Sequence, residues 1–417
     1  METINTNGVE IRSWCPNIEE SALNQMKVIA ELPYTKECCL MPDAHFGMKN
    51  GMPVGGVIAL DGVVVPNAVG VDIGCGMCAL KTNLKVSDLN EVSSKELFNK
   101  ISRNIPVGHS HNTDERRKFL EKCYMDKFTY IMDKSGIKDR PNPIGDIQTA
   151  FFSQLGTLGG GNHFCEVQVD EAGSVWVMIH SGSRNIGKRI GDCFNDLATE
   201  LNAKWFSEKR IIPFLPVDTD EGQDYIAWMD FALRFAFLNR IIMMDAVKDA
   251  LERTFNDVEY ITKNVVEDSI NDVINIHHNF AALECHHGKN VWVHRKGATR
   301  AFEGMTGIIP GSMGTHSYIV KGLGNHQSLM SCSHGAGRKM GRKVFSRQMQ
   351  DNYAEIEKSL EGVIHSEFGN FPYGKDKGLK DVSEAPGAYK NIDEVIENEL
   401  DLVKVLVKLS PKICVKG

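Results

Sequence analysis

Residues 54–78 read VGGVIALDGVVVPNAVGVDIGCGMC, and this stretch sets our expectation for the fold. Two apolar runs, 54–60 and 63–71, flank the pair Asp61-Gly62. An Asp-Gly pair between such runs is a strong signal for a β-hairpin with a two-residue turn. The second run leads directly into a glycine-rich turn at 71–78. We therefore expect a β-rich first half whose strands end in tight, polar turns.

The rest of the chain mixes short strands with longer helical patterns. Apolar, β-branched runs predict strands at 175–179 and 291–294, and 304–314 predicts a glycine-rich loop with a strand. Apolar residues at helical spacing predict helices over 190–206, 224–253, 335–358 and 392–407. The elements do not follow a regular βαβ period, which argues against Rossmann and TIM-barrel folds. Without an internal repeat or linker, we predict one compact α+β domain over residues 1–417, with a β-rich core and surrounding helices.

The composition narrows the class of protein. With 42% hydrophobic and 24% charged residues, the 417-residue chain can bury a large core, which excludes disordered and low-complexity classes. A net charge of −7 excludes a globally basic nucleic-acid-binding protein but allows a locally basic groove. The start of the chain lacks the features of a secretory signal, and its longest uncharged stretches are too rich in glycine for a membrane span. Eleven cysteines without regular spacing predict reduced thiols and a cytoplasmic protein.

The turn at 71–78 holds the first candidate site. Asp72 and Cys75 lie three residues apart after a strand pattern, so a carboxylate and a thiolate could reach one metal ion. The turn could equally be buried, with its cysteines acting as small hydrophobic residues. A third interpretation is a redox or zinc half-site formed by Cys75 and Cys78, although the chain has no second CxxC motif. The residues of this turn leave the three interpretations open.

Two further turns carry polar residues that could bind a ligand. In LGGGNHFCE, residues 158–166, three glycines allow the backbone to approach a ligand closely, and Asn162 and His163 follow at once. In IHSGSR, residues 179–184, a strand pattern delivers His180, and Arg184 could clamp a phosphate. Either segment could also be an ordinary polar turn.

Two histidine pairs differ in what they indicate. In His277-His278-Asn279, one histidine can face a site while its neighbour points away. His286-His287 lies in a polar stretch that we interpret as a surface segment between a helix and a loop. Only the first pair is therefore a candidate for a site.

The most unusual motif is SCSHGAGR, residues 331–338. His334 precedes Gly-Ala-Gly and then a basic helical pattern. The N-terminus of such a helix would offer free N–H groups and a positive dipole end to an anion, with His334 beside it. That geometry suits nucleophilic attack on phosphorus, although a histidine that only caps the helix is the alternative. The loop at 309–314 and the cations Arg295 and Lys296 at a strand end are further ligand-binding features.

Together these motifs indicate a divalent metal acting on nucleotide phosphates. The chain combines aspartate, cysteine and several histidines in tight turns with glycine loops and cations at segment ends. It lacks the P-loop pattern, so a nucleoside triphosphate site would not be of the Walker type.

The motifs GVDIGCG, GGGNHF, HSGSR, HHN, IPGSMG and SHGAGR together resemble those of the RtcB-type RNA ligases. The likeness runs from MPDAH at 41–45 to VKG at 415–417, without an intein-like insert. The resemblance implies the single α+β domain of that family. It also implies that the chain joins RNA 3′-phosphate or 2′,3′-cyclic phosphate ends to 5′-hydroxyl ends, in RNA repair or tRNA splicing, using GTP and two manganese ions.

The resemblance also implies roles for particular residues. The guanylylated histidine falls on His334, and Tyr389 resembles the tyrosine that stacks on the base. We expect Lys416 and Glu166 to recognise guanine together. The implied metal ligands are Asp72, Cys75 (as the thiolate that bridges the two ions), His163, His180 and His278. The implied GTP contacts are Asn162, His163, Phe164, Cys165, Glu166, His278, Asn279, Pro310, Gly311, Ser312, Met313, Ser317, His334, Gly335, Ala336, Gly337, Tyr389 and Lys416.

Two other classes of function compete with the ligase. A metal-dependent phosphodiesterase that opens cyclic phosphates without ligating would not need His334, and a non-catalytic RNA- or nucleotide-binding protein would not need the metal ligands either. The expected partners are RNA with broken ends, such as tRNA halves and tRNA or rRNA fragments, and an archease-type activator. Because the whole chain is acidic, RNA must bind to local cations, for which the candidates are Arg184, Lys188, Arg189, Arg338, Lys339, Arg342, Lys343 and Arg347.

Overall fold

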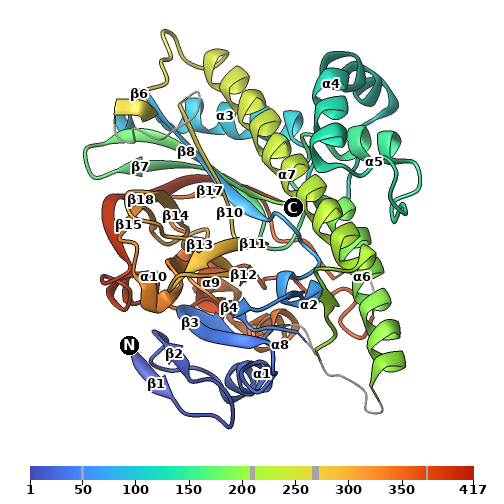
Figure 1. The fold of residues 1–417 in the computed structure, drawn as a ribbon. Coiled ribbons are helices and arrows are strands. Elements are labelled where there is room, and N and C mark those ends of the chain that lie inside the picture. Colours follow the sequence, from blue (N-terminus) through green and yellow to red (C-terminus); the bar gives the residue numbers. More distant parts are fainter. Residues whose placement is uncertain (48–50, 207–211, 265–271, 372–373) are drawn as a thin grey trace.

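Two sheets carry most of the strands (Figure 1). The computed structural model describes residues 1–47, 51–206, 212–264, 272–371 and 374–417. The six-stranded sheet is antiparallel except where its second and third strands pair in parallel. In spatial order it consists of β1 (Glu2–Ile4), β2 (Ile11–Ser13), β3 (Thr35–His45), β4 (Val54–Leu60), β12 (Lys289–Lys296) and β11 (Asn279–His286).

The eight-stranded sheet lies beside the first. Its spatial order is β10 (Val273–His277), β6 (Gly76–Lys85), β8 (Ser174–Ser181), β7 (Phe164–Asp170), β18 (Val403–Lys416), β15 (Ser317–Gly322) and β14 (Thr306–Ile309), and β17 (Ile364–His365) pairs with β18. Side chains alternate between its faces. Cys78 and Leu80 pack in one core with Met243, whereas Met77 and Ala79 pack in another on the opposite face. Two small sheets pair β13 (Ala298–Arg300) with β16 (Ser331–Ser333) and β5 (Val63–Val64) with β9 (Leu215–Pro216).

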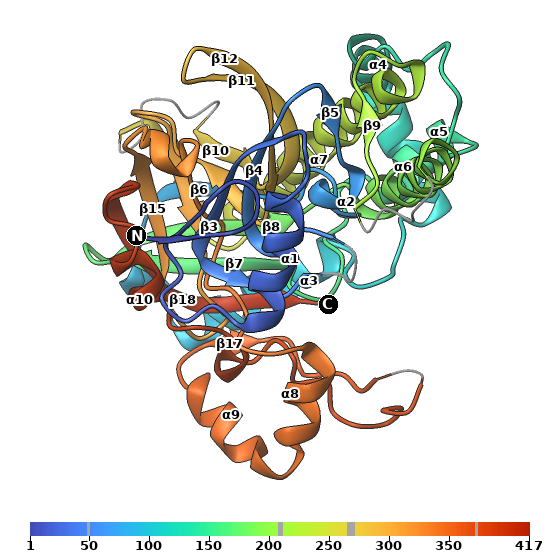
Figure 2. The ribbon, with the colours of Figure 1, turned by 60° about the horizontal axis from the view of Figure 1, so that its bottom comes forward.

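Helices cover the large sheet and form two outlying groups. The long helix α7 contacts β6, β8 and β10, and Figure 1 shows it running across the molecule beside α4, α5 and α6. In Figure 2 the helices α8 and α9 form a separate lobe. The helices are α1 (Glu20–Ala30), α2 (Pro66–Val69), α3 (Glu91–Asn104), α4 (Asp114–Ser135), α5 (Ile147–Gln154), α6 (Arg184–Trp205), α7 (Asp220–Glu252), α8 (Arg342–Gln348), α9 (Tyr353–Ser359) and α10 (Ile392–Glu397).

The structure confirms the α+β class and a single compact domain. The strands predicted at 54–60, 175–179 and 291–294 lie within β4, β8 and β12. The helices predicted at 190–206 and 224–253 correspond to α6 and α7. None of the described helices is long and apolar enough to cross a lipid bilayer.

The hairpin predicted around Asp61-Gly62 is wrong. The strand β4 pairs with β3 and β12, whereas only Val63 and Val64 continue as a strand, and these pair with β9. Pro66 has no amide hydrogen for a sheet ladder and instead opens the one-turn helix α2. The second apolar run therefore turns away from β4 and leads the chain into the 71–78 turn.

Two helix predictions in the last quarter of the chain are also corrected. Residues 335–341 form an irregular segment in which Arg338 makes an isolated β-bridge with Tyr389. Because α8 begins only at Arg342, no helix N-terminus lies directly after His334. In the 392–407 region, α10 ends at Glu397 and the long strand β18 follows. Val403, Val405 and Val407 alternate with lysine and leucine, and this two-residue period is that of a strand. The segment therefore forms a strand in spite of its helical pattern.

Candidate active site

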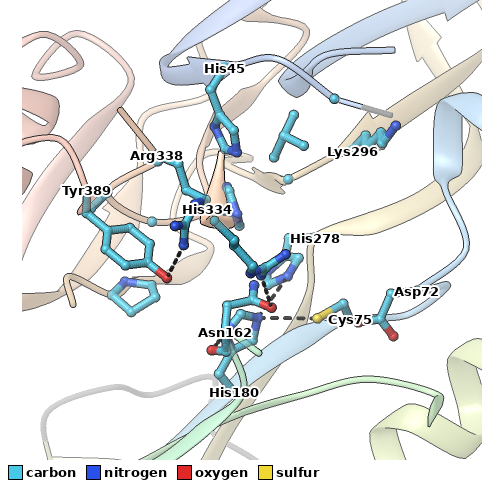
Figure 3. A pocket seen from close by; sticks show the side chains of 18 of the residues that line it. His45, Asp72, Cys75, Asn162, His180, His278, Lys296, His334, Arg338 and Tyr389 are labelled. Atoms are coloured by element: carbon cyan, nitrogen blue, oxygen red, sulfur yellow. Dashed lines mark hydrogen bonds between the residues drawn. The ribbon is translucent and has the colours of Figure 1, made fainter. Parts of the chain in front are cut away.

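The ends of several strands converge on a cavity of about 570 Å³ (Figure 3). Phe164 begins β7, His180 lies near the end of β8, and Asn279 begins β11. His334 directly follows β16. The predicted site residues that line the cavity are Asp72, Cys75, Asn162, Phe164, His180, His278, Asn279, Pro310, Gly311, Ser312, Met313, His334, Gly335, Ala336, Gly337, Tyr389 and Lys416. Segments far apart in the sequence thus contribute to one chamber.

The predicted metal ligands form a continuous cluster at one wall. Cys75 Sγ lies 3.2 Å from His180 Nε2 and 3.4 Å from His163 Nε2. Asp72 Oδ2 lies 3.1 Å from His163 Nε2, and His278 Nε2 lies 3.3 Å from His180 Nε2. The ligand atoms of Cys75, His163 and His180 all lie within 4.8 Å of one another. The cluster has the composition and spacing of a metal site.

Hydrogen bonds to the backbone fix the orientation of two of these imidazoles. His163 Nδ1 lies 2.9 Å from the Leu158 carbonyl oxygen, and His180 Nδ1 lies 3.0 Å from that of Asn162. A carbonyl accepts only from a protonated nitrogen, so each Nε2 keeps its lone pair and faces the cluster. The buried Nε2 lone pairs repel one another and the cysteine sulfur unless a cation lies between these atoms. The residues present therefore fit metal ions, with the support that metal-binding histidines usually receive.

The electrostatics of the cluster lead to the same conclusion. Burial lowers the pKa of His180 and His278 well below the usual value, which keeps both imidazoles neutral and able to coordinate. Burial, with the neighbouring Asp72 carboxylate, raises the pKa of the Cys75 thiol. Burial opposes ionisation of Asp72, but the neighbouring His163, Cys75 and Arg184 together outweigh it and lower the pKa of that carboxyl group. A cation is what this site needs in order to ionise the thiol.

Glycines allow this dense arrangement at two positions. A Cβ at Gly159, which has φ +99°, would lie 2.1 Å from Arg184 Nη1 and 2.6 Å from His163 Nδ1. A Cβ at Gly182 would lie 2.2 Å from Asp72 Oδ1. Arg184 itself reaches the Gly108 carbonyl at 3.2 Å and lies against His163. Arg184 therefore supports the metal cluster from behind and does not line the cavity as a phosphate clamp would.

His334 lies next to the metal cluster and is held by a buried carboxylate. Its ring centroid is 4.8 Å from that of His278. Asp43 Oδ2 is 2.6 Å from His334 Nδ1 and also accepts from the His334 backbone N–H at 3.2 Å. Asp43 is fully buried. Since Nδ1 is occupied by Asp43, Nε2 is the nitrogen of His334 that is available for attack.

Sequence reasoning did not assign Asp43 a role. It was noticed only as part of the segment 41–45 at which the family likeness begins. In the structure it lies near the end of β3, and 291 residues separate it from the histidine that it orients. No local pattern connects two such distant residues, so only the fold could show the pair.

A second carboxylate that sequence reasoning missed, Glu384, organises the other end of the cavity. Arg342 Nε lies 2.9 Å, Arg338 Nη1 3.3 Å and Lys416 Nζ 3.4 Å from its oxygens. Burial alone would raise the pKa of Glu384, but these three cations lower it to about 2. Tyr389 donates its hydroxyl hydrogen to Glu384, and Arg338 lies over the ring of Tyr389, 4.9 Å from its centroid. Tyr389 lines the cavity, and its role in stacking on the base stays a prediction.

Four of the predicted ligand contacts do not line the cavity: His163, Cys165, Glu166 and Ser317. His163 belongs to the metal cluster but not to the lining, and Cys165 packs in the core on the helix-covered face of the large sheet. Glu166 is buried and accepts from Gln168 at 2.6 Å, and Gln168 also reaches Ser317. Burial raises the pKa of Glu166 to about 7. Glu166, which we expected to recognise guanine together with Lys416, thus lies outside the cavity lining, and Lys416 forms an ion pair with Glu384.

The other cysteine and histidine predictions have mixed outcomes. Cys78 lies in the core beside the Arg240 carbonyl, which disfavours the CxxC interpretation. His277 does point away from its neighbour His278, toward the carbonyl of Gly74 at 3.0 Å. The surface assignment of the second pair is wrong for His286, which is buried in β11. Its Nε2 is 3.0 Å from Glu284, so a buried carboxylate satisfies it, and His287 alone is exposed.

The candidate cations for RNA binding fall into two groups. One group forms ion pairs within the protein. Arg338 and Arg342 pair with Glu384, Arg347 forms a bidentate pair with Asp376, and Lys188 pairs with Asp192. Arg189, Lys339 and Lys343 are exposed and form none of these ion pairs.

A buried cluster of metal-binding residue types beside a carboxylate-held histidine, in one cavity, is the arrangement of an enzyme active site. A profile of the family described as tRNA-splicing ligase RtcB matches residues 25–417, and the chain belongs to this family.

Similar proteins extend over the whole chain. It is 36% identical over 439 aligned residues to the Escherichia coli K12 protein named RNA-splicing ligase RtcB, an alignment that covers 100% of this chain and 99% of that protein. It is 31% identical to the tRNA-splicing ligase RtcB of Thermococcus kodakarensis, with 96% and 92% of the two chains covered. It is also 31% identical to RNA-splicing ligase RtcB homolog 2 of Entamoeba dispar, with 95% and 84% covered.

Proposed function

We propose that this protein is an RNA ligase that seals RNA 3′-phosphate or 2′,3′-cyclic phosphate ends to 5′-hydroxyl ends. Its relatives carry the names of RNA-splicing and tRNA-splicing ligases, which supports an RNA ligase acting in repair or splicing. The observation that carries the proposal is the His334–Asp43 pair beside the Cys75 cluster in one cavity. The family and the names of its members favour the ligase over a phosphodiesterase that only hydrolyses cyclic phosphates.

The proposed reaction has three steps, and His334 acts in the first. Its Nε2 attacks the α-phosphorus of GTP, the P–N bond forms and pyrophosphate leaves. The 3′-phosphate of the RNA, formed by addition of water across the ring where the end is a 2′,3′-cyclic phosphate, then attacks that phosphorus, so GMP passes to the RNA and His334 is released. Finally the 5′-hydroxyl attacks the activated 3′-phosphate, the phosphodiester forms and GMP leaves. Asp43 stabilises the positive charge that develops on the imidazole during the first step.

Activation by GMP is needed because a phosphate monoester has no good leaving group. An oxide cannot be displaced at neutral pH, whereas a phosphoanhydride offers GMP as the leaving group. At the nucleotide end of the cavity we place the base against Tyr389, with Glu384 and Lys416 beside it. The two oxygens of Glu384 already accept from Arg338, Arg342, Lys416 and Tyr389, so the base is recognised by Lys416, whose ammonium can donate to O6 of guanine. Adenine carries an amino group in place of O6 and cannot accept from this ammonium.

We propose that Asp72, Cys75, His163, His180 and His278 hold two manganese ions. Bound metal would neutralise the charge that develops on the phosphoryl oxygens. Broken tRNA or rRNA, including tRNA halves, would reach the cavity across the exposed cations Arg189, Lys339 and Lys343. Activation by an archease-type protein is part of the same proposal, and the eleven free cysteines are consistent with work in a reducing cytoplasm.

The test uses RNA substrates that separate the steps. The wild-type protein with GTP and Mn²⁺ should join a 3′-phosphate RNA to a 5′-hydroxyl RNA. His334→Ala should lose this activity but should still join an RNA that already carries GMP on its 3′-phosphate, because His334 acts only in the first step. Opening of a cyclic phosphate without joining would instead support the phosphodiesterase. Loss of both reactions in a folded His334→Ala protein would contradict the step assigned to His334.

A further inference from the structure

The cavity extends beyond His334 to an end that the nucleotide does not occupy in the proposed reaction. This far end is lined by Glu19, Phe46, Gly47, Gly70 and Lys296. Tyr389 and Arg338 lie on one side of His334 in Figure 3, and Lys296 lies on the other. The chamber therefore has two ends, with the candidate nucleophile between them.

Lys296 is a buried cation without a counter-charge. It ends β12 and is only 7% exposed. Its ammonium donates to the carbonyl oxygens of Met52 at 2.9 Å and Asn67 at 3.4 Å. Within the described part of the chain, no carboxylate lies within ion-pair distance of this ammonium. Glu19, the acidic residue at this end, is exposed and already accepts from the backbone N–H of Phe46.

The contrast with the nucleotide end is informative. There Arg338, Arg342 and Lys416 share the carboxylate of Glu384. Burial without such a partner lowers the pKa of Lys296 to about 8. Lys296 therefore still carries its charge at neutral pH, but no carboxylate neutralises that charge. Two carbonyls use two of its three N–H groups, and one donor and the net charge remain for a ligand.

The backbone holds Lys296 in a fixed relation to the reacting centre. A Cβ on the next residue, Gly297, would lie 2.9 Å from His334 Cε1, so this backbone packs directly against the imidazole. On the other side, the Lys296 stem passes close to Gly70, where a Cβ would lie 3.3 Å from Cε. The ammonium is thus placed by a strand end, two carbonyls and a glycine.

The geometry of phosphoryl transfer says which substrate reaches this end. The attacking and leaving oxygens lie roughly in line on opposite sides of phosphorus. In the last proposed step GMP leaves toward Tyr389, so the 5′-hydroxyl must approach from the opposite side of His334. That side is the end lined by Lys296.

We propose that Lys296 is a binding and positioning residue for the RNA strand that carries the 5′-hydroxyl, through an ion pair with its first phosphodiester. This inference rests on the proposed ligase function. The 3′-phosphate strand and GTP do not need this contact. Lys296 therefore acts in the joining step and not in the formation or transfer of GMP.

The test compares Lys296→Met with Lys296→Arg and with Lys289→Met, a matched control at the exposed start of the same strand. Three reactions are measured separately: GMP transfer to the protein, GMP transfer to a 3′-phosphate RNA, and joining of a pre-activated RNA to a 5′-hydroxyl RNA. Lys296→Met should keep the first two. Its KM for the 5′-hydroxyl strand should rise about 10–100-fold, the usual effect of losing a hydrogen bond to a charged group.

Salt dependence separates a phosphate contact from a merely structural role. Lys296→Met should reduce the slope of log KM against log salt concentration by about 0.7, as expected for one lost contact to a single strand. Lys296→Arg should keep the wild-type slope, and Lys289→Met should match the wild type throughout. An unchanged KM and slope in Lys296→Met would overturn the proposal, as would an equal loss of all three reactions in a protein that melts like the wild type.

A chemical variant of the substrate tests the contact without altering the protein. Replacing the first phosphodiester of the 5′-hydroxyl strand by an uncharged methylphosphonate should raise its KM for the wild-type enzyme about 10–100-fold. The same change far along the strand should have little effect, and equal sensitivity at both linkages would refute the placement. A wild-type protein that accepts no GMP would instead refute the ligase function itself.

Discussion

The pair of Asp43 and His334 makes the sharpest single prediction. Replacing Asp43 by Asn keeps the shape of the side chain and removes its charge. The change affects the 2.6 Å contact with His334 Nδ1 and the 3.2 Å contact with the His334 backbone N–H. We expect slow guanylylation with little change in the affinity for GTP, since Asp43 does not line the cavity.

The magnitude follows from the burial of the pair. Asp43 is fully buried, and the exposed fraction of the His334 side chain is 13%. Removing one partner of a buried charged pair costs about 3–5 kcal/mol. The imidazole becomes cationic only as Nε2 attacks, so this cost falls on the transition state, and a factor of ten in rate corresponds to about 1.36 kcal/mol. Asp43→Asn should therefore slow guanylylation by about 10²–10⁴-fold.

The assay is single-turnover transfer of labelled GMP from GTP to the protein over a range of GTP concentrations. Asp401→Asn is the control, because Asp401 accepts from Trp14 at 2.9 Å and lies outside the cavity lining. The reasoning is refuted if Asp43→Asn transfers GMP at the wild-type rate. It is equally refuted if the whole loss is in the affinity for GTP, or if joining of pre-activated RNA is lost to the same extent.

Three further predictions concern the metal cluster, the chain end and a buried acid. Cys75→Ala should lose bound manganese and slow guanylylation by more than the ~10–100-fold typical of changes around a metal ligand, whereas Cys78→Ala should keep its manganese and its guanylylation rate. Metal analysis and GMP labelling check this, and equal losses in the two variants would revive the CxxC interpretation. Deleting residues 416–417 should raise the KM for GTP about 10–100-fold, because Lys416 supplies a charged donor beside Glu384. Guanylylation at varied GTP concentrations tests this. An unchanged KM with retained rejection of ATP would exclude Lys416 from base recognition. Glu399 is fully buried, and burial raises its pKa from 4.5 to about 8, so the stability that its neutral form contributes below pH 4.5 is lost as the pH rises through 8. In thermal unfolding, Glu399→Gln should therefore become progressively more stable than the wild type over that interval. Parallel stability curves for the two proteins would contradict the assignment.

Tight turns were the part of the site that the sequence predicted well. Cys75, His163, His180 and His278 each lie in or beside a short glycine-rich or strand-end motif, and the structure brings all four together. Such motifs are local, so their geometry depends on few distant contacts. The family resemblance added which of these turns belong to one site.

Contacts between distant segments could not be predicted in the same way. Asp43 and Glu384 act through residues from other elements, and a lone acidic residue has no local pattern that reveals its partner. Glu166 illustrates the opposite error, since its place next to the glycine loop suggested the cavity. Glu166 shares a face of β7 with Phe164, which lines the cavity, but it lies two residues farther along the strand, beside Gln168 and outside the lining.

The errors in secondary structure have similar physical causes. The Asp-Gly turn predicted a hairpin because both flanking runs are apolar, but Pro66 cannot continue a ladder and β4 finds its partners elsewhere. Residues 403–407 belong both to the helical pattern predicted over 392–407 and to a strand alternation, and in the structure they begin β18. Pairing with β7 and β15 on its two sides stabilises the strand, and that information lies outside the segment.

The central claim is that His334 carries GMP during catalysis, and mass spectrometry tests it most directly. The wild-type protein is incubated with GTP and Mn²⁺ in the absence of RNA, and its intact mass and peptides are then measured. The account predicts one added GMP per chain, mapped to the peptide containing His334 and removed by acid, as a P–N bond requires. An unmodified protein, or GMP mapped to any other residue, would contradict it.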